Sequence, residues 1–580
     1  MNVVIVGGVA GGATAAARIR RLDEQAQIVV FERTGYVSYA NCGLPYFIGG
    51  TIADPQALTL QTPESFAARF RVAMKVRHEV TAIHRDRKTV SVINLATGEE
   101  FEEPYDKLIL SPGAKPTLPR LPGVGLKKVF TLRTVEDTFR IKEFVDTEHP
   151  RSAVIAGGGF IGLELAENLC ELGVDVTIVQ RPKQLMNPLD PDMASFIHAE
   201  MRRHGVKLAL GHTVEGFQET GGSVEVLLKD EAPLHADMVV LAIGVTPDTH
   251  LAQQAGLALG IKGSILVDDR MQTSDPDIYA VGDAVQVKHS VTDQDALISL
   301  AGPANKQGRI AADNICGYDS HTCGSQGSSI IKVFDLTAAV TGVNQTAAEK
   351  AGLKTGSVIL SPMSHAGYYP GGKLMTLKVV FEQGTYRLLG AQIVGYEGVD
   401  KRIDVLATAL HAGMRATELE ELDLAYAPPY SSAKDPVNMA GFMIDNIEKG
   451  IVKQWHLTDL GALLGNEDVT LLDARTAFEY TRGHIDGFVN IPVDELRERL
   501  GELDPSKPVY VICQSGLRSY IACRILTGYG YDAYNFSGGY RYYEAVTADR
   551  ALIEQAAPCG MDRQASEHMA RDEGGPWDTF

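Results

Sequence analysis

The chain opens with an alternation of apolar runs and glycine turns that is typical of an α/β protein. Residues 3–6 form an apolar, β-branched run, which indicates a buried parallel strand, and residues 13–21 favour a helix. A glycine-rich turn at 7–12 separates them, and a second apolar run covers 28–31. Strand, turn, helix and strand together predict a βαβ unit whose helix begins at a binding site for phosphate groups.

The first turn matches the dinucleotide fingerprint G-x-G-x-x-G imperfectly. Gly7 and Gly12 fit the pattern, whereas Val9 occupies the position of the middle glycine. The next strand ends in Glu32 and Arg33, and a carboxylate at this point accepts hydrogen bonds from ribose hydroxyls. We therefore assign Gly7, Gly12, Glu32 and Arg33 to a first nucleotide site.

The same order returns further along the chain, with a complete fingerprint. The segment AVIAGGGFIG places Gly157, Gly159 and Gly162 after an apolar strand and before a helix. Gln180 and Arg181 stand where the first unit has its carboxylate. Because no carboxylate repels a 2′-phosphate and Arg181 can pair with one, we expect NADPH to be accepted as well as NADH. A solvated surface arginine is the alternative for Arg181.

Composition narrows the choice of partners and compartment. The 580 residues exceed one hydrophobic core, and about 150 residues per domain suggests about four domains. A net charge of −19 argues against nucleic acid or an anionic membrane as a partner. No apolar run approaches the ~18 residues that span a bilayer. Seven widely spaced cysteines form no disulfide framework and suit a reducing cytoplasm, and no metal site is predicted because the cysteines and histidines are scattered.

Three further segments resemble motifs of the pyridine nucleotide-disulfide reductases. Residues 273–283 (TSDPDIYAVGD) resemble the second flavin motif, whose aspartate holds the ribityl chain. Residues 110–114 resemble the connection that leaves the flavin domain, and residues 241–247 resemble the turn that returns to it. The resemblance implies FAD in the first nucleotide site and NADPH or NADH in the second. It gives four more residues to the flavin: Ser111, Gly113, Gly282 and Asp283.

One cysteine, Cys42, follows the first βαβ unit in the segment SYANCGLPY (38–46). Reductases with an internal dithiol carry a second cysteine a few residues away, and this segment has none. It closely resembles the coenzyme A-disulfide reductases and the related coenzyme A-dependent persulfide and polysulfide reductases. The resemblance implies that Cys42 is the nucleophile and rests as a mixed disulfide with coenzyme A. A small buried packing residue is the alternative.

Coenzyme A carries phosphates and needs a local cationic surface. Thr14, Arg18 and Arg21 lie at i, i+4 and i+7 of the first helix and share one face. The resemblance gives coenzyme A this face together with further residues of the first domain: Ser38, Asn41 and Arg69. A solvated arginine at the end of a helix is the alternative for Arg18 and Arg21.

Two later segments are close to signatures of the same family. They are HAGYYPG (365–371) and YAPPYSSAKD (426–435). The resemblance implies a homodimer in which Tyr368 and Tyr426 reach the other subunit's cysteine while Lys434 contacts coenzyme A. A tyrosine hydroxyl can hydrogen-bond or protonate a departing thiolate, although core packing is the alternative for either residue.

The C-terminal part resembles the rhodanese domain. LLDAR (471–475) precedes EYTRGHIDG (479–487), and the loop CQSGLRS (513–519) follows an apolar strand at 509–512. Small residues let successive backbone N–H groups point at an anion, so a thiolate or persulfide on Cys513 would be stabilised there, with help from a helix N-terminus and from Arg518. We expect Cys513 to carry sulfane sulfur.

The expected fold is α/β, with two Rossmann-like domains, an α+β dimerisation domain and an α/β rhodanese domain. The expected boundaries are 1–149 and 245–327 for the FAD domain, 150–244 for the NAD(P) domain, 328–446 for dimerisation, 447–466 for a linker, 467–550 for rhodanese and 551–580 for a tail. The sequence leaves the sulfur substrate, the transfer from Cys513 to Cys42 and the role of Cys559 open. Two other hypotheses are an NADH oxidase or peroxidase that uses a sulfenic acid on Cys42, and a sulfur carrier regulated by its flavoprotein part.

Overall fold

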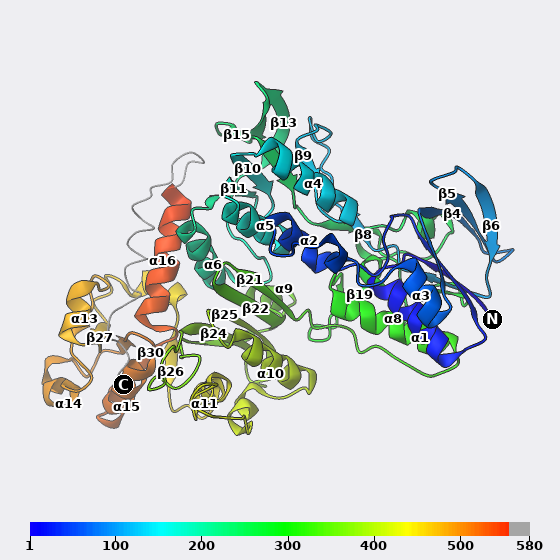
Figure 1. Cartoon of the computed structure of the whole chain (residues 1–580). Coiled ribbons are helices and arrows are strands. Elements are labelled where there is room, and N and C mark those ends of the chain that lie inside the picture. Colours follow the sequence, from blue (N-terminus) through cyan, green and yellow to red (C-terminus); the bar gives the residue numbers. More distant parts are fainter. Residues whose placement is uncertain (556–580) are drawn as a thin grey trace. The chain divides into compact units, whose positions relative to one another are not determined.

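The computed structural model describes residues 1–555, and the predicted tail beyond them, with Cys559, lies outside the described residues. The chain forms two compact units (Figure 1). The first unit contains residues 1–183 and 205–327, and the second contains residues 184–204 and 328–555. In the part of the chain that is described, no helix combines the length and the apolar character needed to cross a bilayer.

The first unit begins with a five-stranded parallel sheet in the order β18-β7-β1-β2-β3. Its strands are β1 (Asn2–Val6), β2 (Gln27–Glu32), β3 (Ala73–Val76), β7 (Lys107–Leu110) and β18 (Ile278–Ala280). Helix α1 (Ala10–Leu22) follows β1 and packs along α8 (Ala301–Ile315). Strand β18 and α8 come from far downstream, so the chain leaves this domain and later completes it.

The insertion between these parts is a second parallel sheet, in the order β12-β11-β10-β16-β9. Its strands are β9 (Val129–Thr131), β10 (Ser152–Ala156), β11 (Asp175–Gln180), β12 (Lys207–Leu210) and β16 (Met238–Leu241). The antiparallel pair β8 (Ala114–Pro116) and β17 (Val245–Pro247) marks where the chain enters and leaves. Strand β9 therefore belongs to the second sheet, although the predicted boundary placed it in the FAD domain.

Two antiparallel sheets of three strands extend the first unit. They are β4 (His78–His84), β5 (Thr89–Asn94) and β6 (Glu100–Pro104), and β13 (Val214–Thr220), β14 (Ser223–Leu228) and β15 (Leu234–Ala236). Neither contributes a predicted site residue.

The second unit contains an antiparallel sheet in the order β21-β22-β25-β24-β23. Its strands are β21 (Ser329–Val333), β22 (Leu336–Gly342), β23 (Thr355–Leu360), β24 (Met375–Glu382) and β25 (Leu388–Gly395). Every residue of β25 is buried, and α10 (Val399–His411) and α6 (Pro191–Arg203) both pack on this sheet. A strand buried throughout needs cover on both faces, which these helices help to provide.

The second unit also contains a parallel sheet in the order β26-β30-β29-β27-β28. Its strands are β26 (Lys453–Trp455), β27 (Thr470–Asp473), β28 (Val489–Asn490), β29 (Val509–Ile512) and β30 (Ala533–Phe536). Trp455 is 1% exposed and its indole N–H donates to the Val511 carbonyl at 3.2 Å. Part of the segment predicted as a linker is therefore an edge strand, because the core of this domain buries its tryptophan.

Helix α16 (Gly539–Gln555) packs against α6 through a buried charge cluster. Asp549 accepts from Arg202 at 2.6 Å and lies 2.7 Å from Nδ1 of His198. Burial raises the pKa of the Asp549 carboxyl, but His198 and Arg202 outweigh burial and hold that pKa below its ordinary value. The carboxylate therefore ties the last helix to the rest of the second unit.

We predict that Asp549→Ala lowers the free energy of unfolding of the second unit by about 3 kcal/mol, because Arg202 loses a buried counter-charge. His198, whose Nε2 accepts from the Leu185 N–H, also loses the acceptor of its Nδ1. Asp175→Ala, which removes an exposed pair with Lys207, should cost at most about 1 kcal/mol. A carboxyl with a depressed pKa stabilises above its unfolded pKa and loses this effect as pH falls, so the wild-type advantage should shrink toward acid. Thermal unfolding across pH checks this, and equal losses in both variants would contradict it.

Candidate functional site

The two glycine turns of the first unit share one backbone geometry. Gly7 and Gly157 have φ of 97° and 120°, a left-handed region that favours glycine. A Cβ on Gly7 would lie 2.0 Å from the Ser111 carbonyl oxygen, and one on Gly157 would lie 2.2 Å from that of Ala242. Each turn thus runs directly against the end of a neighbouring strand, where a helix N-terminus can receive phosphate.

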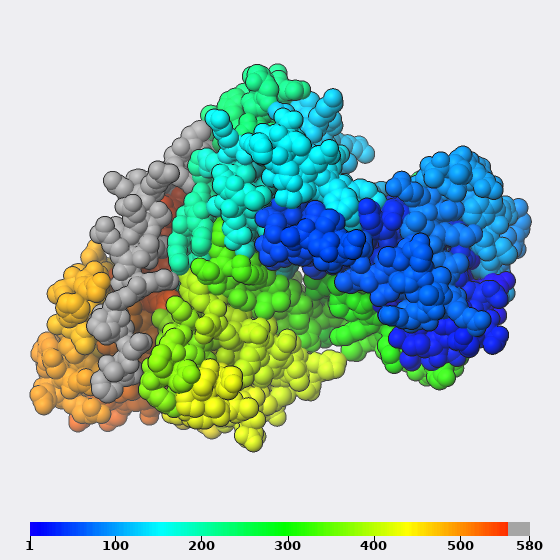
Figure 2. All heavy atoms as spheres, in the orientation of Figure 1, coloured from blue at the N-terminus to red at the C-terminus, as the bar shows by residue number. Residues whose placement is uncertain are grey.

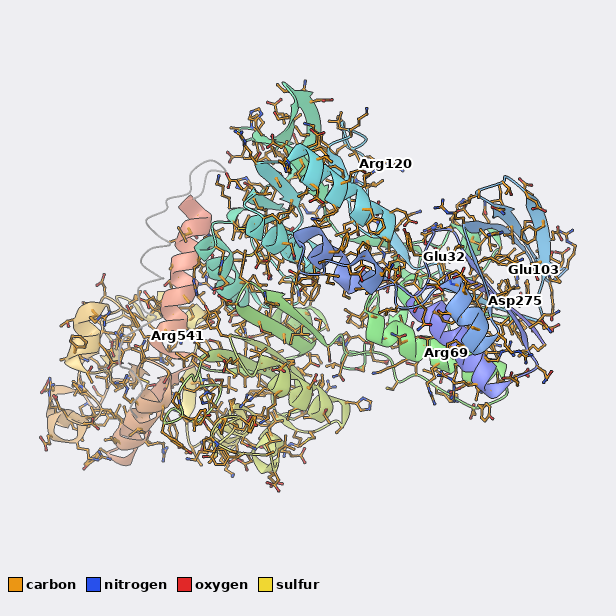
Figure 3. The ribbon with its side chains drawn as sticks, in the orientation of Figure 1. Glu32, Arg69, Glu103, Arg120, Asp275 and Arg541 are labelled. Carbon is orange, nitrogen blue, oxygen red and sulfur yellow. The ribbon has the colours of Figure 1, made fainter. Side chains whose placement is uncertain are left out.

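A side-chain acceptor closes each turn in the same way. Oε2 of Glu32 accepts from the Gly8 N–H at 2.8 Å, and Oε1 of Gln180 accepts from the Gly158 N–H at 3.0 Å. Glu32 is labelled in Figure 3, at the end of β2. Gln180 is therefore the structural counterpart of Glu32, and it carries no charge.

Further residues predicted to bind the nucleotides lie within these turns or next to Glu32 and Gln180 in the chain. Arg33 pairs with Asp248 at 2.8 Å, and Arg181 is exposed. A Cβ on Gly12 would meet the carbonyl oxygen of Gly7 at 1.9 Å, and one on Gly162 would meet that of Gly157 at 2.1 Å. A Cβ on Gly159 would meet nothing within 4 Å, so the middle of the second turn leaves space for a ligand.

Cys42 lies in a short 3-10 turn, Asn41–Gly43, which leads into helix α2 (Leu44–Gly49). The thiol residue is exposed. Helix α2 packs against α4 (Val135–Glu148) and α5 (Phe160–Glu171), and Figure 2 shows its blue surface directly against the cyan surface of these helices. The cysteine turn therefore leads from the first nucleotide domain to a helix that packs on α4 and α5 of the second domain.

Asn41 leaves a buried acceptor beside this thiol. Its Oδ1 has no hydrogen-bond partner although it is buried. An unsatisfied buried carbonyl costs free energy unless a donor reaches it, so this atom fits a bound group that offers an N–H or O–H. Together with the two glycine turns, this supports the fit of the first unit to a flavin and to the predicted thiol ligand.

Charged groups around Cys42 work in opposite directions. Burial, Glu164 and Asp283 raise the pKa of the Cys42 thiol, while Arg133 lowers it. Arg133 pairs with Asp283, the predicted ribityl ligand, at 2.7 Å. Glu164 lies in the first turns of α5, and burial together with Glu167 raises its own pKa to about 7. Sequence reasoning missed Arg133 and Glu164, because only tertiary packing brings them to the thiol.

The predicted coenzyme A face of α1 is turned toward α8. Thr14 donates to Oδ1 of Asn305 at 2.6 Å, and Arg18 pairs with Asp313 at 2.6 Å. Arg21 and Arg69 are exposed, and Figure 3 labels Arg69 on α3 (Pro63–Phe70). Ser38, which precedes the cysteine turn, has φ of 48° and donates its N–H to the Gly8 carbonyl. A role for these residues in coenzyme A binding stays a prediction.

The structure brings the two predicted tyrosines of the second unit together. The hydroxyls of Tyr368 and Tyr426 lie 2.6 Å apart, although 58 positions separate them in the chain. Both side chains are exposed, at 75% and 45%, and Lys434 is exposed as well. A solvent-facing hydroxyl pair does not serve core packing, so the packing alternative is disfavoured for both tyrosines.

A buried arginine, Arg402 on α10, ties together the two loops that carry this pair. Its guanidinium donates to the Ser364 carbonyl at 2.9 Å and to Oγ of Ser431 at 3.0 Å, and it pairs with Asp435 at 3.1 Å. Ser431 in turn donates to Asp435 at 2.6 Å. Sequence reasoning missed this residue, since a lone arginine in an amphipathic helix gives no sign of burial.

Cys513 directly follows strand β29 and is fully buried. Its Sγ accepts from the Gly516 N–H at 3.1 Å and lies 3.2 Å from the Ser519 hydroxyl. Gly516 has φ of 101° and is the N-cap of α15 (Leu517–Gly528), so the start of this helix faces the sulfur. The Arg518 guanidinium instead forms two hydrogen bonds with Glu479, at 2.6 and 2.7 Å. Ser519 is a sulfur ligand that sequence reasoning did not single out.

One group of residues has the ligand atoms for a cation, within the described range: Glu200, His204 and Asp335. Glu200 already accepts from the Tyr396 hydroxyl at 3.0 Å and lies 3.5 Å from the Arg203 guanidinium. An adjacent guanidinium opposes a cation, so this group is an ion-pair network. The expectation of no metal stays a prediction.

Two dinucleotide sheets, a lone thiol in the turn that follows the first nucleotide unit and a cysteine in an anion-binding loop define a nucleotide-dependent thiol oxidoreductase with a sulfur-handling domain. Residues 1–308 match the model of the pyridine nucleotide-disulphide oxidoreductases, and residues 328–436 match the dimerisation domain of the same proteins. Residues 456–545 match the rhodanese-like domain. The chain belongs to the pyridine nucleotide-disulphide oxidoreductase family, which depends on FAD and NAD(P)H, and the predicted fold class is confirmed.

Relatives within this family share most of the chain. A coenzyme A disulfide reductase of Staphylococcus aureus is 38% identical over 444 residues, which are 76% of this chain and 99% of the relative. Reduced CoADR-RHD of Bacillus anthracis is 46% identical, with a TM-score of 0.92 and coverage of 95% and 98%. A NAD-dependent persulfide reductase from A. fulgidus is 38% identical, with a TM-score of 0.88 and coverage of 94% and 100%. A water-forming NADH oxidase from Lactobacillus brevis is 29% identical, with a TM-score of 0.75, and covers 78% of this chain.

We predict that Glu164→Gln lowers the pKa of Cys42, because it removes a negative charge that disfavours the thiolate. The pH dependence of Cys42 alkylation by iodoacetamide, followed by peptide mass spectrometry, should then move to lower pH. Glu171→Gln is the matched control on the same helix, because Glu171 raises the pKa of Cys170. An unchanged Cys42 profile in Glu164→Gln would rule the coupling out.

Proposed function

We propose that this protein uses NAD(P)H to reduce coenzyme A disulfide, coenzyme A persulfide or polysulfide through Cys42. The observation that carries the proposal is an exposed lone thiol at the turn after the first nucleotide unit, in a chain whose next cysteine is Cys170. Because Cys42 forms no disulfide with another cysteine of residues 1–555, its sulfur partner would be an external thiol. The relatives named for coenzyme A disulfide and persulfide reduction support coenzyme A as that thiol.

The cofactor sites follow from the two glycine turns. FAD, when bound, passes the electrons of NAD(P)H to sulfur at Cys42. Gly7, Gly12 and Glu32 would hold the flavin nucleotide, with Asp283 at its ribityl chain. In the second site the uncharged Gln180 would tolerate a 2′-phosphate.

Cys42 would act as the nucleophile on the sulfur substrate. Its thiolate attacks one sulfur of coenzyme A disulfide, a new S–S bond forms, and the other coenzyme A leaves as a thiolate with the electron pair of the broken bond. The Tyr368 and Tyr426 hydroxyls would hydrogen-bond such a departing thiolate. The match to a dimerisation domain supports a homodimer in which this pair serves the partner's thiol. A reducing cytoplasm suits this chemistry.

The rhodanese-like domain would supply sulfane sulfur as a persulfide on Cys513. Two relatives cover 95% and 94% of this chain, which includes the rhodanese-like residues, whereas the NADH oxidase covers 78%. This difference favours sulfur reduction over oxygen or peroxide reduction.

Mass spectrometry of the purified, non-reduced protein should find coenzyme A attached to Cys42. Cys42→Ser should lower NAD(P)H consumption with coenzyme A disulfide by at least about 10³-fold, because it removes the nucleophile. Cys513→Ser is the control and should keep this activity. A mass gain of oxygen alone on Cys42, with turnover on oxygen, would favour the oxidase instead.

We also predict that Gln180→Glu lowers kcat/KM for NADPH relative to NADH by about tenfold or more, because a carboxylate repels the 2′-phosphate. The new side chain still has an oxygen that can accept from the Gly158 N–H, so the turn should persist. Arg181→Ala should lower the same ratio if its guanidinium pairs with the phosphate. Steady-state kinetics with both nucleotides measure these ratios, and an unchanged ratio in Gln180→Glu would refute the assignment.

A further inference from the structure

The one arginine of the reactive loop (513–519), Arg518, and an arginine that borders this loop, Arg475, are each paired with a carboxylate. Arg518 forms two hydrogen bonds with Glu479, as described above. Arg475 is 2% exposed and pairs with Asp473 at 2.7 Å, while its guanidinium lies 3.7 Å from the centre of the Tyr540 ring. Tyr540 donates its backbone N–H to the Cys513 carbonyl, so this second pair also borders the loop.

Glu479 is held in place and ionised. It is part of a capping box at the start of α13 (Ala477–Arg482), where Thr476 donates its N–H and its hydroxyl to the carboxylate at 2.9 and 2.8 Å. Burial raises the pKa of Glu479, yet the hydrogen bonds from Arg518 and Thr476 outweigh burial and bring that pKa to about 2. The carboxylate is therefore charged at neutral pH and cancels the charge of Arg518.

The sulfur itself is held by uncharged donors. Sγ of Cys513 contacts the Gly516 N–H and the Ser519 hydroxyl, which suit a thiolate or a persulfide with a single negative charge. Leu517 and Phe478, the chain neighbours of Arg518 and Glu479, are 61% and 62% exposed, and the Arg482 guanidinium lies 5.8 Å from the centre of the Phe478 ring. Within the loop itself, residues 513–519, a small dianion such as thiosulfate would meet no uncompensated arginine.

We infer that the Cys513 loop selects organic persulfides over thiosulfate and that Glu479 is the residue that sets this selection. The inference rests on the proposed role of Cys513 as a sulfur carrier and names its donor class. Loading proceeds as R–S–S–H plus the Cys513 thiolate giving Cys513–S–S–H plus R–S⁻. The bond between the two donor sulfurs breaks, its electron pair leaves with the donor thiolate, and the proton stays on the transferred sulfur. No oxidant is required.

The test uses the full-length protein without NAD(P)H in single-turnover loading. The donors are thiosulfate and the persulfide of N-acetylcysteamine, an uncharged thiol, and peptide mass spectrometry follows the added sulfur atom on Cys513. Wild type should load at least about tenfold faster from the organic persulfide. Glu479→Gln, which keeps an acceptor for Thr476, should speed loading from thiosulfate by about tenfold, because Arg518 regains its charge. Glu502→Gln, which removes one of the two carboxylates paired with Arg499 at the surface, should change neither rate.

Equal wild-type rates with the two donors, or no gain with thiosulfate in Glu479→Gln, would overturn the inference. The rate of Glu479→Gln with the organic persulfide shows whether the variant loop is intact, and it should stay near that of wild type. Should neither donor load Cys513, the carrier role would fail together with the inference. The reductase activity of Cys42, measured separately by NAD(P)H consumption, would then still stand or fall by itself.

Discussion

Both nucleotide units depend on a close contact between the backbone of a glycine turn and the backbone at the end of a neighbouring strand. At Gly7 and at Gly157 the turn passes so close to a neighbouring strand end that a single Cβ would overlap a carbonyl oxygen. This approach places the start of each helix at the carboxyl end of its sheet, where phosphate groups are bound. The first turn also contacts the segment that leads to Cys42, because Ser38 donates its N–H to the carbonyl of Gly8 within this turn. The first glycine turn therefore contacts both the candidate nucleotide site and the segment that carries Cys42.

The two cysteines to which we assign sulfur chemistry have different surroundings. Cys42 is exposed and lies among charged groups, with Arg133 favouring its thiolate and Glu164 opposing it. Such a balance leaves the thiol responsive to whatever binds beside it. Cys513 is fully buried, and its sulfur accepts from a backbone N–H and lies near a hydroxyl. Arg518 and Arg475 are each paired with a carboxylate. A site of this kind holds one negative charge on sulfur without attracting more.

Buried charges organise the second unit. Arg402 joins the loops of Tyr368 and Tyr426 through Ser364, Ser431 and Asp435, so two exposed hydroxyls are positioned from beneath by one guanidinium. The two Nη nitrogens of this guanidinium meet carbonyls, a hydroxyl and a carboxylate, which offset the burial of its charge, while its buried Nε has no hydrogen-bond partner within the described residues. Burying these ion pairs costs desolvation free energy, and in return the pairs hold the loops and helices in a single arrangement.

The features with a local signal could be read from the sequence. Gly157, Gly159 and Gly162 lie within six residues, and apolar runs mark buried strands, so the fold class could be predicted. Cys42 and Cys513 stand in recognisable segments, so they could be named as candidates. Contacts between distant segments could be seen only in the folded chain. They bury Trp455 in an edge strand and place β9 in the second sheet. They also give four charged residues their partners: Arg133, Glu164, Arg402 and Glu479. The sequence does not show whether a charged side chain is solvated or buried. Its neighbours in the folded structure determine its pKa, and therefore its charge and the chemistry that it can support.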